Sequence, residues 1–131
     1  MTMRAKGTFE VKMSPEPPYD TADGVSLGRI AIEKVFVGEL EATSTVNMIS
    51  ARSAAVPNSA GYVAIERVRG SLAGRAGSFV LQHSGTMTRG VPTLALTVVP
   101  DSGTGELATL SGKMAIDIID GKHFYTFEYE L

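Results

Sequence analysis

Apolar and polar residues alternate along most of this chain, in short runs that Gly, Pro, Asn and Asp separate. In the first run, Phe9, Val11 and Met13 fall on one face of an extended segment. A period of two is typical of β-strands, and no segment shows the 3.6-residue period of an amphipathic helix. The pattern predicts strands at about Gly7–Met13, Gly28–Val37, Glu39–Ser50, Gly61–Leu72, Gly77–Thr88, Leu94–Val99, Leu110–Ile119 and Lys122–Leu131.

The predicted strands are short, and most of the links between them are tight, which is typical of an antiparallel meander. Closing a meander into a barrel removes the unpaired strand edges that an open sheet exposes. An eight-stranded barrel encloses room for core side chains or for one small ligand. A chain of 131 residues forms one domain by its size. We therefore expect a single all-β domain over residues 1–131, an eight-stranded antiparallel up-and-down barrel.

Two turn signals fix the register of two hairpins. A two-residue type I′ turn at Asp120-Gly121 needs positive φ at both positions, and it pairs Ile118 with His123 on the inner face. A turn at Ala73-Gly74 places Glu66 and His83 on the inner face, diagonally across one hairpin. A carboxylate beside an imidazole orients and charges the ring, which is the basis of general acid–base chemistry near neutral pH.

A third turn is predicted at Val37-Gly38. It pairs Lys34 with Glu41 on the outer face and directs Arg29 and Glu33 inward. The outer face then carries two apolar pairs, Ile30 with Ile32 and Val63 with Ile65. Apolar pairs on the surface of so small a protein favour a homo-oligomer.

The predicted interior is mostly apolar, but several polar side chains and several small residues share it. Buried charges are costly unless they are paired or solvated, so their presence indicates a polar patch or a wet pocket. The candidate catalytic residues are Glu66 and His83. The candidate ligand-binding residues are Tyr62, Glu66, His83, His123, Arg29, Glu33 and Tyr125.

Three functions remain open for such a barrel. It binds a small, partly apolar molecule; or it is an isomerase or cyclase that uses Glu66 and His83 as an acid–base pair; or it is an oligomeric scaffold with a filled interior. In the third case the pairs Arg29 with Glu33 and Glu66 with His83 are satisfied buried pairs that fix the register. Of these functions, small-molecule binding is the one we expect.

The amino-acid composition argues against several classes of partner. There is no cysteine, and the net charge is −2 with scattered Lys and Arg, so no basic stripe indicates nucleic-acid binding. No apolar run approaches the ~20 residues that span a bilayer, and the N-terminal stretch does not read as a signal peptide, so we expect a cytoplasmic protein without a membrane partner. The two histidines are isolated in sequence, and we expect no metal and no cofactor.

The stretch "VVPDSGTGEL" contains the Asp-Ser-Gly triplet of an aspartic protease. Such an enzyme needs two carboxylates that share a proton, and here one copy follows Pro100 instead of a strand residue. Pro, Asp, Ser and Gly are turn residues, so Asp101 is predicted to occupy a turn.

Four long stretches carry a family resemblance: "GRIAIEKVFVGELEATS", "SAGYVAIERVRGSLAGRAGSFVLQHSGTM", "VVPDSGTGEL" and "IIDGKHFYTFEYEL". The chain resembles, from about Gly7 to Leu131, a bacterial family of uncharacterised proteins called domain of unknown function 3224. The resemblance implies a barrel similar to that of allene oxide cyclase, with dirigent proteins close in architecture. That enzyme's sequence motifs are absent, so the resemblance extends to the fold and not to cyclase activity.

Overall fold

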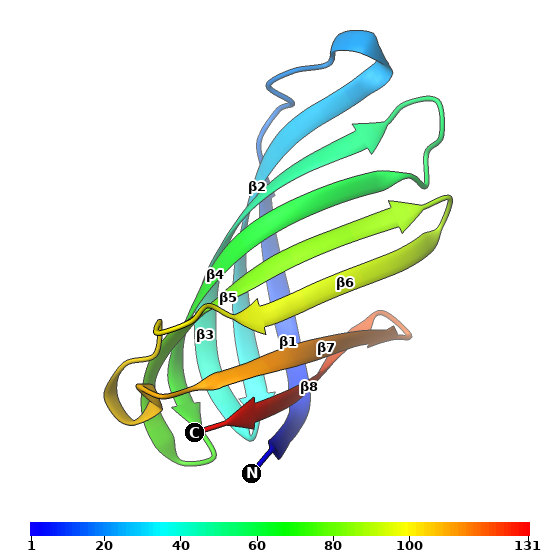
Figure 1. Ribbon diagram of the computed structural model, residues 1–131. Coiled ribbons are helices and arrows are strands. Elements are labelled where there is room, and N and C mark those ends of the chain that lie inside the picture. The colour runs from blue at the N-terminus through cyan, green and yellow to red at the C-terminus, as the bar shows by residue number, and fades with distance from the viewer.

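The computed structural model describes residues 1–131 as one closed barrel of eight antiparallel strands in sequential order (Figure 1). Two short 3₁₀ turns, η1 (Ala22–Gly24) and η2 (Gly105–Leu107), lie in the connections. The predicted all-β up-and-down barrel is confirmed. The strands are β1 (Met3–Pro15), β2 (Val25–Gly38), β3 (Leu40–Ser53), β4 (Ala60–Leu72), β5 (Arg75–Thr88), β6 (Val91–Val98), β7 (Ser111–Ile119) and β8 (Lys122–Glu130).

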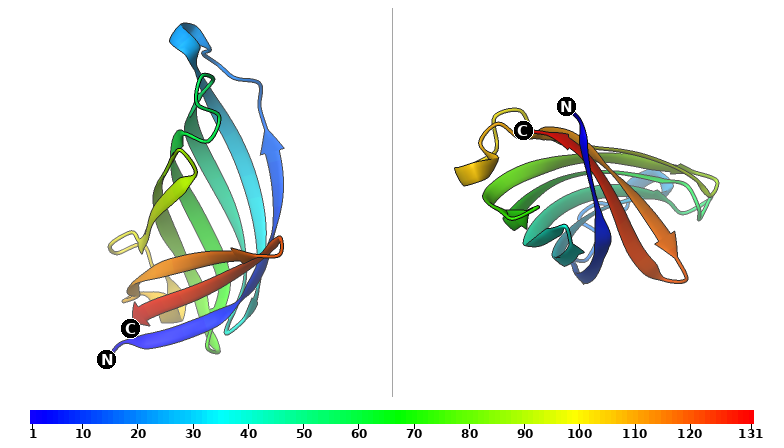
Figure 2. Two further views of the ribbon diagram at one scale, coloured as in Figure 1. Left: turned by 90° about the vertical axis from the view of Figure 1, so that its right-hand side faces the viewer. Right: turned by 90° about the horizontal axis from the view of Figure 1, so that it is seen from below.

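The two ends of the barrel differ in shape. The end called lower here holds both chain termini and the turns that join β2 to β3 and β4 to β5 (Figures 1 and 2). The end called upper here holds the β1–β2, β3–β4 and β5–β6 connections. Strands β2 to β5 are 13 or 14 residues long and rise well above the β7–β8 hairpin, whose strands have nine residues each.

Two of the predicted registers are confirmed. Asp120 and Gly121 have φ of 51° and 77°, and Ile118 pairs with His123. In the β4–β5 hairpin, Glu66 pairs with Leu81, and Ala64 pairs with His83. Both turns have the two residues that the sequence predicts. A glycine takes the positive φ at the second position of each turn, and Ala73 and Asp120 adopt φ of 49° and 51° at the first.

The predicted β2–β3 register is wrong. Lys34 pairs with Ser44 instead of Glu41, and the ladder stops at Phe36 and Ala42. Five residues, 37–41, lie between the last paired residues of this ladder, where two were predicted, so the register shifts by three positions, an odd number. An odd shift moves every side chain of a strand to the other face.

The hydroxyl of Tyr125 takes the place of the missing ladder bonds in this connection. It accepts a hydrogen bond from the Leu40 N–H (3.0 Å), and its one hydrogen is shared between the carbonyl oxygens of Val37 (3.1 Å) and Leu40 (3.3 Å). A Cβ on Gly7 would lie 2.5 Å from this hydroxyl and 2.0 Å from the Val37 carbonyl oxygen. Tyr125 on β8 therefore fixes the shape of a connection between two other strands.

The ladder between β6 and β7 holds a single residue pair, Thr97 with Lys113. Every other neighbouring pair of strands shares seven or more. The two strands diverge from that pair toward the upper end (Figure 1). Proline is tolerated at a strand edge, and Pro92 lies in the part of β6 that has no partner on this side.

The main hydrophobic core fills the lower end, where 17 buried residues form one cluster. The rings of Phe79, Phe127 and Tyr129 stack in its centre, with centroids 5.8 and 5.3 Å apart. A second cluster of three buried residues, Ile32, Val46 and Ala64, lies higher in the barrel.

The connection from β6 to β7 continues along the edge of β5. Ser102 and Thr104 accept hydrogen bonds from the Val80 and Ser78 N–H groups, in place of a strand partner. Asp101 has φ of 59° and lies in a turn, as predicted. The structure contains no helix with the length and apolar character needed to span a bilayer.

Candidate functional site

Four polar side chains are buried inside the barrel, between the lower core and the upper apolar cluster. We call them the polar layer: Lys34, Ser44, Glu66 and His83. They come from four consecutive strands, β2 to β5, and each lies on the inward-facing parity of its strand. The pleat thus brings to one level four residues that span 50 positions of sequence.

Glu66 is the centre of this layer and is fully buried. Its Oε1 accepts hydrogen bonds from His83 Nε2 (2.7 Å) and Lys34 Nζ (3.1 Å), and its Oε2 accepts one from Ser44 Oγ (2.6 Å). Burial by itself would raise the pKa of Glu66. The hydrogen bond from His83, the Lys34 charge, the hydrogen bond from Ser44 and the His83 charge outweigh burial, so the pKa lies below its ordinary value.

Lys34 is held by aromatic rings as well as by Glu66. Its Nζ lies 4.8 Å from the ring centroid of Phe9 and 5.8 Å from that of Phe36. Cation–π contacts with desolvated rings stabilise an ammonium group that has left water. The buried charge is therefore paired on one side and covered by aromatic faces on the other.

Tyr62 lies beside His83 at the upper side of the polar layer, with ring centroids 6.3 Å apart. A Cβ on Gly85 would lie 2.4 Å from the Tyr62 ring, so the absence of a side chain there makes room for it. Burial, and then the negative charge of Glu66, raise the pKa of the Tyr62 phenol. Tyr62 therefore presents a neutral hydroxyl at neutral pH.

The remaining predicted residues lie elsewhere. Arg29 and Glu33 were expected inside, and this placement is wrong, because the β2–β3 register puts both on the outer face. Arg29 lies over the ring of Tyr19, at 4.9 Å from its centroid. His123 faces inward but packs on Phe9 (5.0 Å between centroids), away from His83. Tyr125 is buried and occupied by the β2–β3 connection.

The sequence therefore predicted the contact between Glu66 and His83 and the inward position of Tyr62. It did not predict that Lys34 faces inward and pairs with Glu66. The same misplaced register that put Glu33 inside put Lys34 outside. A signal was present, because Phe36 and Ile32 flank Lys34 at even positions, and the residues between them are Glu33 and Val35. Reading the even positions as the inner face places a lysine between two large apolar residues.

The chain matches, over residues 5–129, the family described as "Protein of unknown function (DUF3224)". It belongs to the DUF3224 family. A crystal structure of a protein of unknown function from this family, from Shewanella oneidensis, is 54% identical and has a TM-score of 0.93. The match covers 100% of this chain and 98% of that one. No curated protein matches the chain.

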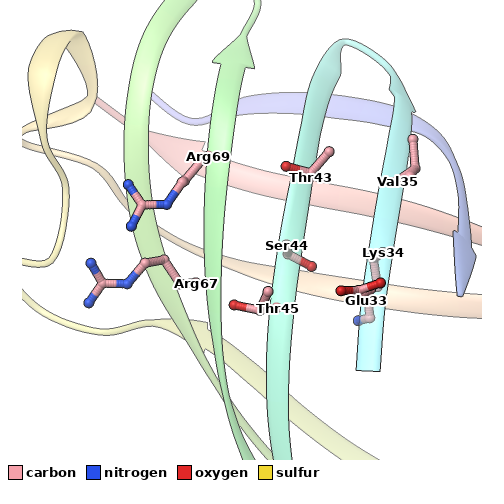
Figure 3. Close-up of a pocket in the computed structure, with 8 residues that line it drawn as sticks. All are labelled: Glu33, Lys34, Val35, Thr43, Ser44, Thr45, Arg67 and Arg69. Carbon is pink, nitrogen blue, oxygen red and sulfur yellow. The ribbon is translucent and has the colours of Figure 1, made fainter. Parts of the chain in front are cut away.

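A hollow of about 310 Å³ lies on the outer face of this DUF3224 barrel, over β2, β3 and β4 (Figure 3). Arg67 and Arg69 line it from β4, opposite Thr45 and Thr43 of β3. Glu33 is part of this outer hollow, and Val35 is the one apolar residue that lines it. Lys34 and Ser44 of the polar layer also line the hollow, so the two lie on opposite sides of the same part of the barrel wall.

The outer face also carries an exposed apolar patch above this hollow. Ile49 pairs with Val63, and Ile65 is two residues along the same strand; about half of each side chain is exposed. The expected exposure of Val63 and Ile65 is confirmed, whereas Ile30 and Ile32 point into the barrel. The homo-oligomer expected from these pairs stays a prediction.

No three His, Cys, Asp or Glu side chains lie together in a metal-binding arrangement.

Proposed function

We propose that this protein binds a small, partly apolar molecule in the upper part of the barrel, above the polar layer. The observation that carries the proposal is a row of apolar side chains that face inward and yet meet solvent. Met13 is 55% exposed, Met87 41%, Leu94 41% and Ile118 65%. Their positions follow the inward parity of β1, β5, β6 and β7.

An exposed apolar inner wall is a typical feature of a ligand site, because concave apolar surface is most strongly stabilised when a ligand displaces its water. Methionine side chains are flexible and adapt to ligands of different shape, and Met13, Met48 and Met87 all lie on this wall. Tyr62 and His83 supply the few polar contacts that orient a ligand in an apolar site. Strands β6 and β7 diverge beside this part of the barrel and share no ladder pair beyond Thr97 and Lys113 (Figure 1).

Native mass spectrometry of the freshly purified protein tests the proposal. We expect a native mass above a whole number of bare chains, and the excess disappears when the protein is denatured. Leu94→Glu places a charge on the inner wall and is expected to abolish the excess mass. Val63→Glu is the matched control, because Val63 is similarly exposed but lies on the outer face.

Three outcomes would count against binding in the barrel: a bare native mass, retention of the excess mass by Leu94→Glu, or its loss in both variants. A bare mass would also be checked by titration with the dye 1-anilinonaphthalene-8-sulfonate, which binds apolar cavities. Absence of dye binding as well would favour a scaffold whose polar layer serves stability alone.

A second candidate function, an isomerase or cyclase, rests on the 2.7 Å contact between Glu66 and His83. Glu66 already accepts three hydrogen bonds, so its role would be to orient the ring, and His83 Nδ1 would act as the base. The molecule eluted from the protein would be incubated with ligand-free protein and analysed by chromatography for an isomer. Retained turnover in Glu66→Gln would contradict this mechanism.

A further inference from the structure

We propose that the ligand carries a carboxylate, or another oxyanion of single charge, and that this group binds at the polar layer against His83 and Tyr62. This inference rests on the proposed binding function and names the chemistry of its ligand. Its starting point is the composition of the layer, which holds two basic side chains, Lys34 and His83, and one carboxylate, Glu66. With a ligand carboxylate bound, the layer would hold two carboxylates and two basic side chains, so that acidic and basic groups are equal in number.

Glu66 has little capacity left for a ligand. Three protein donors occupy its two oxygens, and Lys34 balances its charge. A cationic ligand would therefore meet the Lys34 ammonium without gaining a free acceptor. The charge pattern selects against cations and leaves the second base, His83, as the group that a ligand addresses.

Two polar atoms of the site remain free of protein partners. His83 uses Nε2 to donate to Glu66, and its Nδ1 makes no hydrogen bond within the chain; the Tyr62 hydroxyl makes none either. No buried side-chain nitrogen or oxygen lacks a hydrogen-bond partner, so these two atoms are not sealed in the core. Both are therefore available to a ligand in the upper part of the barrel.

The two free atoms match the two oxygens of a carboxylate. With His83 protonated, Nδ1–H donates to one ligand oxygen and the neutral Tyr62 hydroxyl donates to the other. The groups that face His83 are Glu66 and Tyr62 on β4, Lys34 on β2 through Glu66, and the apolar Leu96 on β6. Glu66 is the negative charge among them that stabilises a protonated ring.

The test compares two probes that differ only in the head group, 4-phenylbutyrate and 4-phenylbutanamide. Isothermal titration calorimetry in Tris buffer gives the affinity of each probe. We expect the carboxylate to bind at least about tenfold more tightly than the amide, because charge-assisted hydrogen bonds are the stronger class.

The chain offers a matched pair of variants, because it contains two histidines and both face inward. His83→Asn is expected to reduce the preference for the carboxylate to about twofold or less. His123→Asn is expected to keep the preference. Tyr62→Phe preserves the ring and is expected to weaken carboxylate binding several-fold while leaving the amide unchanged. Thermal melting of each variant verifies that it is folded.

The outcomes separate this inference from the function on which it rests. Equal affinity for the two probes, or a preference that survives His83→Asn, overturns the anionic head group and leaves small-molecule binding intact. Failure of both probes to bind at millimolar concentration contradicts the binding function itself, and the inference falls with it. Retained carboxylate preference in Tyr62→Phe with loss in His83→Asn removes Tyr62 alone from the site.

Discussion

The lower and upper ends of the barrel are built from the same strands and the same alternation, yet only one of them has a packed interior. Inward side chains near the lower end, such as Phe79 and Phe127, are almost fully buried, whereas Leu94 and Ile118 near the upper end are exposed. The two ends differ in how completely strand pairing closes the barrel wall. Strands β6 and β7 pair only next to the lower end, and the packed core cluster lies at that end as well.

The polar layer marks the boundary between the two ends. A buried ion pair contributes little net stability compared with apolar packing of the same volume. The pairing of Glu66 with Lys34 and His83 is therefore weak evidence that the layer serves stability alone. Below the layer the interior is filled, and above it the walls are apolar and open. The comparison therefore separates a region that holds the fold together from a region that is free to bind.

The largest effect is expected from truncation of the lower core. Phe127→Ala removes a ring that stacks on Phe79 and Tyr129, and it is expected to lower the free energy of unfolding by about 3–5 kcal/mol. Leu94→Ala at the upper end is expected to cost less than about 1 kcal/mol, because its side chain is already partly in water. Urea unfolding of both variants measures the contrast, and equal losses would show that the upper wall is packed as tightly as the lower one.

A loss of about 3 kcal/mol is expected when the polar layer loses its acid. Glu66→Gln leaves the buried Lys34 ammonium without a counter-charge, and unpaired buried charges are strongly destabilising. The double variant Lys34→Met/Glu66→Gln removes the charge as well and is expected to recover more than half of the loss. If the double variant is as unstable as the sum of its two single variants, charge compensation is not what Glu66 provides.

A smaller loss, about 1–3 kcal/mol, is expected for Tyr125→Phe. The substitution keeps the ring and removes the hydroxyl that bonds to the backbone of Val37 and Leu40. Tyr129→Phe is the control, because Tyr129 is also a buried tyrosine of β8 and its hydroxyl makes no hydrogen bond in the structure. Similar stabilities of the two variants in chemical denaturation would contradict the role of Tyr125 in the β2–β3 connection.

The sequence predicted the fold class and two hairpins because the relevant information is local. Strand alternation and the turns at Asp120-Gly121 and Ala73-Gly74 each lie within a few residues of what they determine. The contact between Glu66 and His83 followed from one such turn, and it was predicted correctly as a diagonal pair.

The β2–β3 connection could not be predicted in the same way, because a residue 85 positions away determines it. Tyr125 on β8 supplies the bonds that make a five-residue connection stable, and no local signal near Gly38 records this. Lys34 was misplaced as a consequence. The solvent exposure of the inward side chains at the upper end could not be predicted either. Alternation shows which residues face inward, but it does not show how closely the opposite walls pack.

The smallest expected effect is the pH dependence that Glu66 gives to stability. Its pKa is lowered in the folded protein and has its ordinary value of about 4.5 in the unfolded chain. The associated stabilisation is therefore complete above about pH 4.5 and is lost as the pH falls through the lower folded pKa. Thermal melting from pH 7 to pH 3 is expected to show a shallower decline in Glu66→Gln than in the wild type. Glu10→Gln, at an exposed position on β1, controls for the loss of one carboxylate, and a decline as shallow as that of Glu66→Gln would assign the acid sensitivity to net charge instead of to the polar layer.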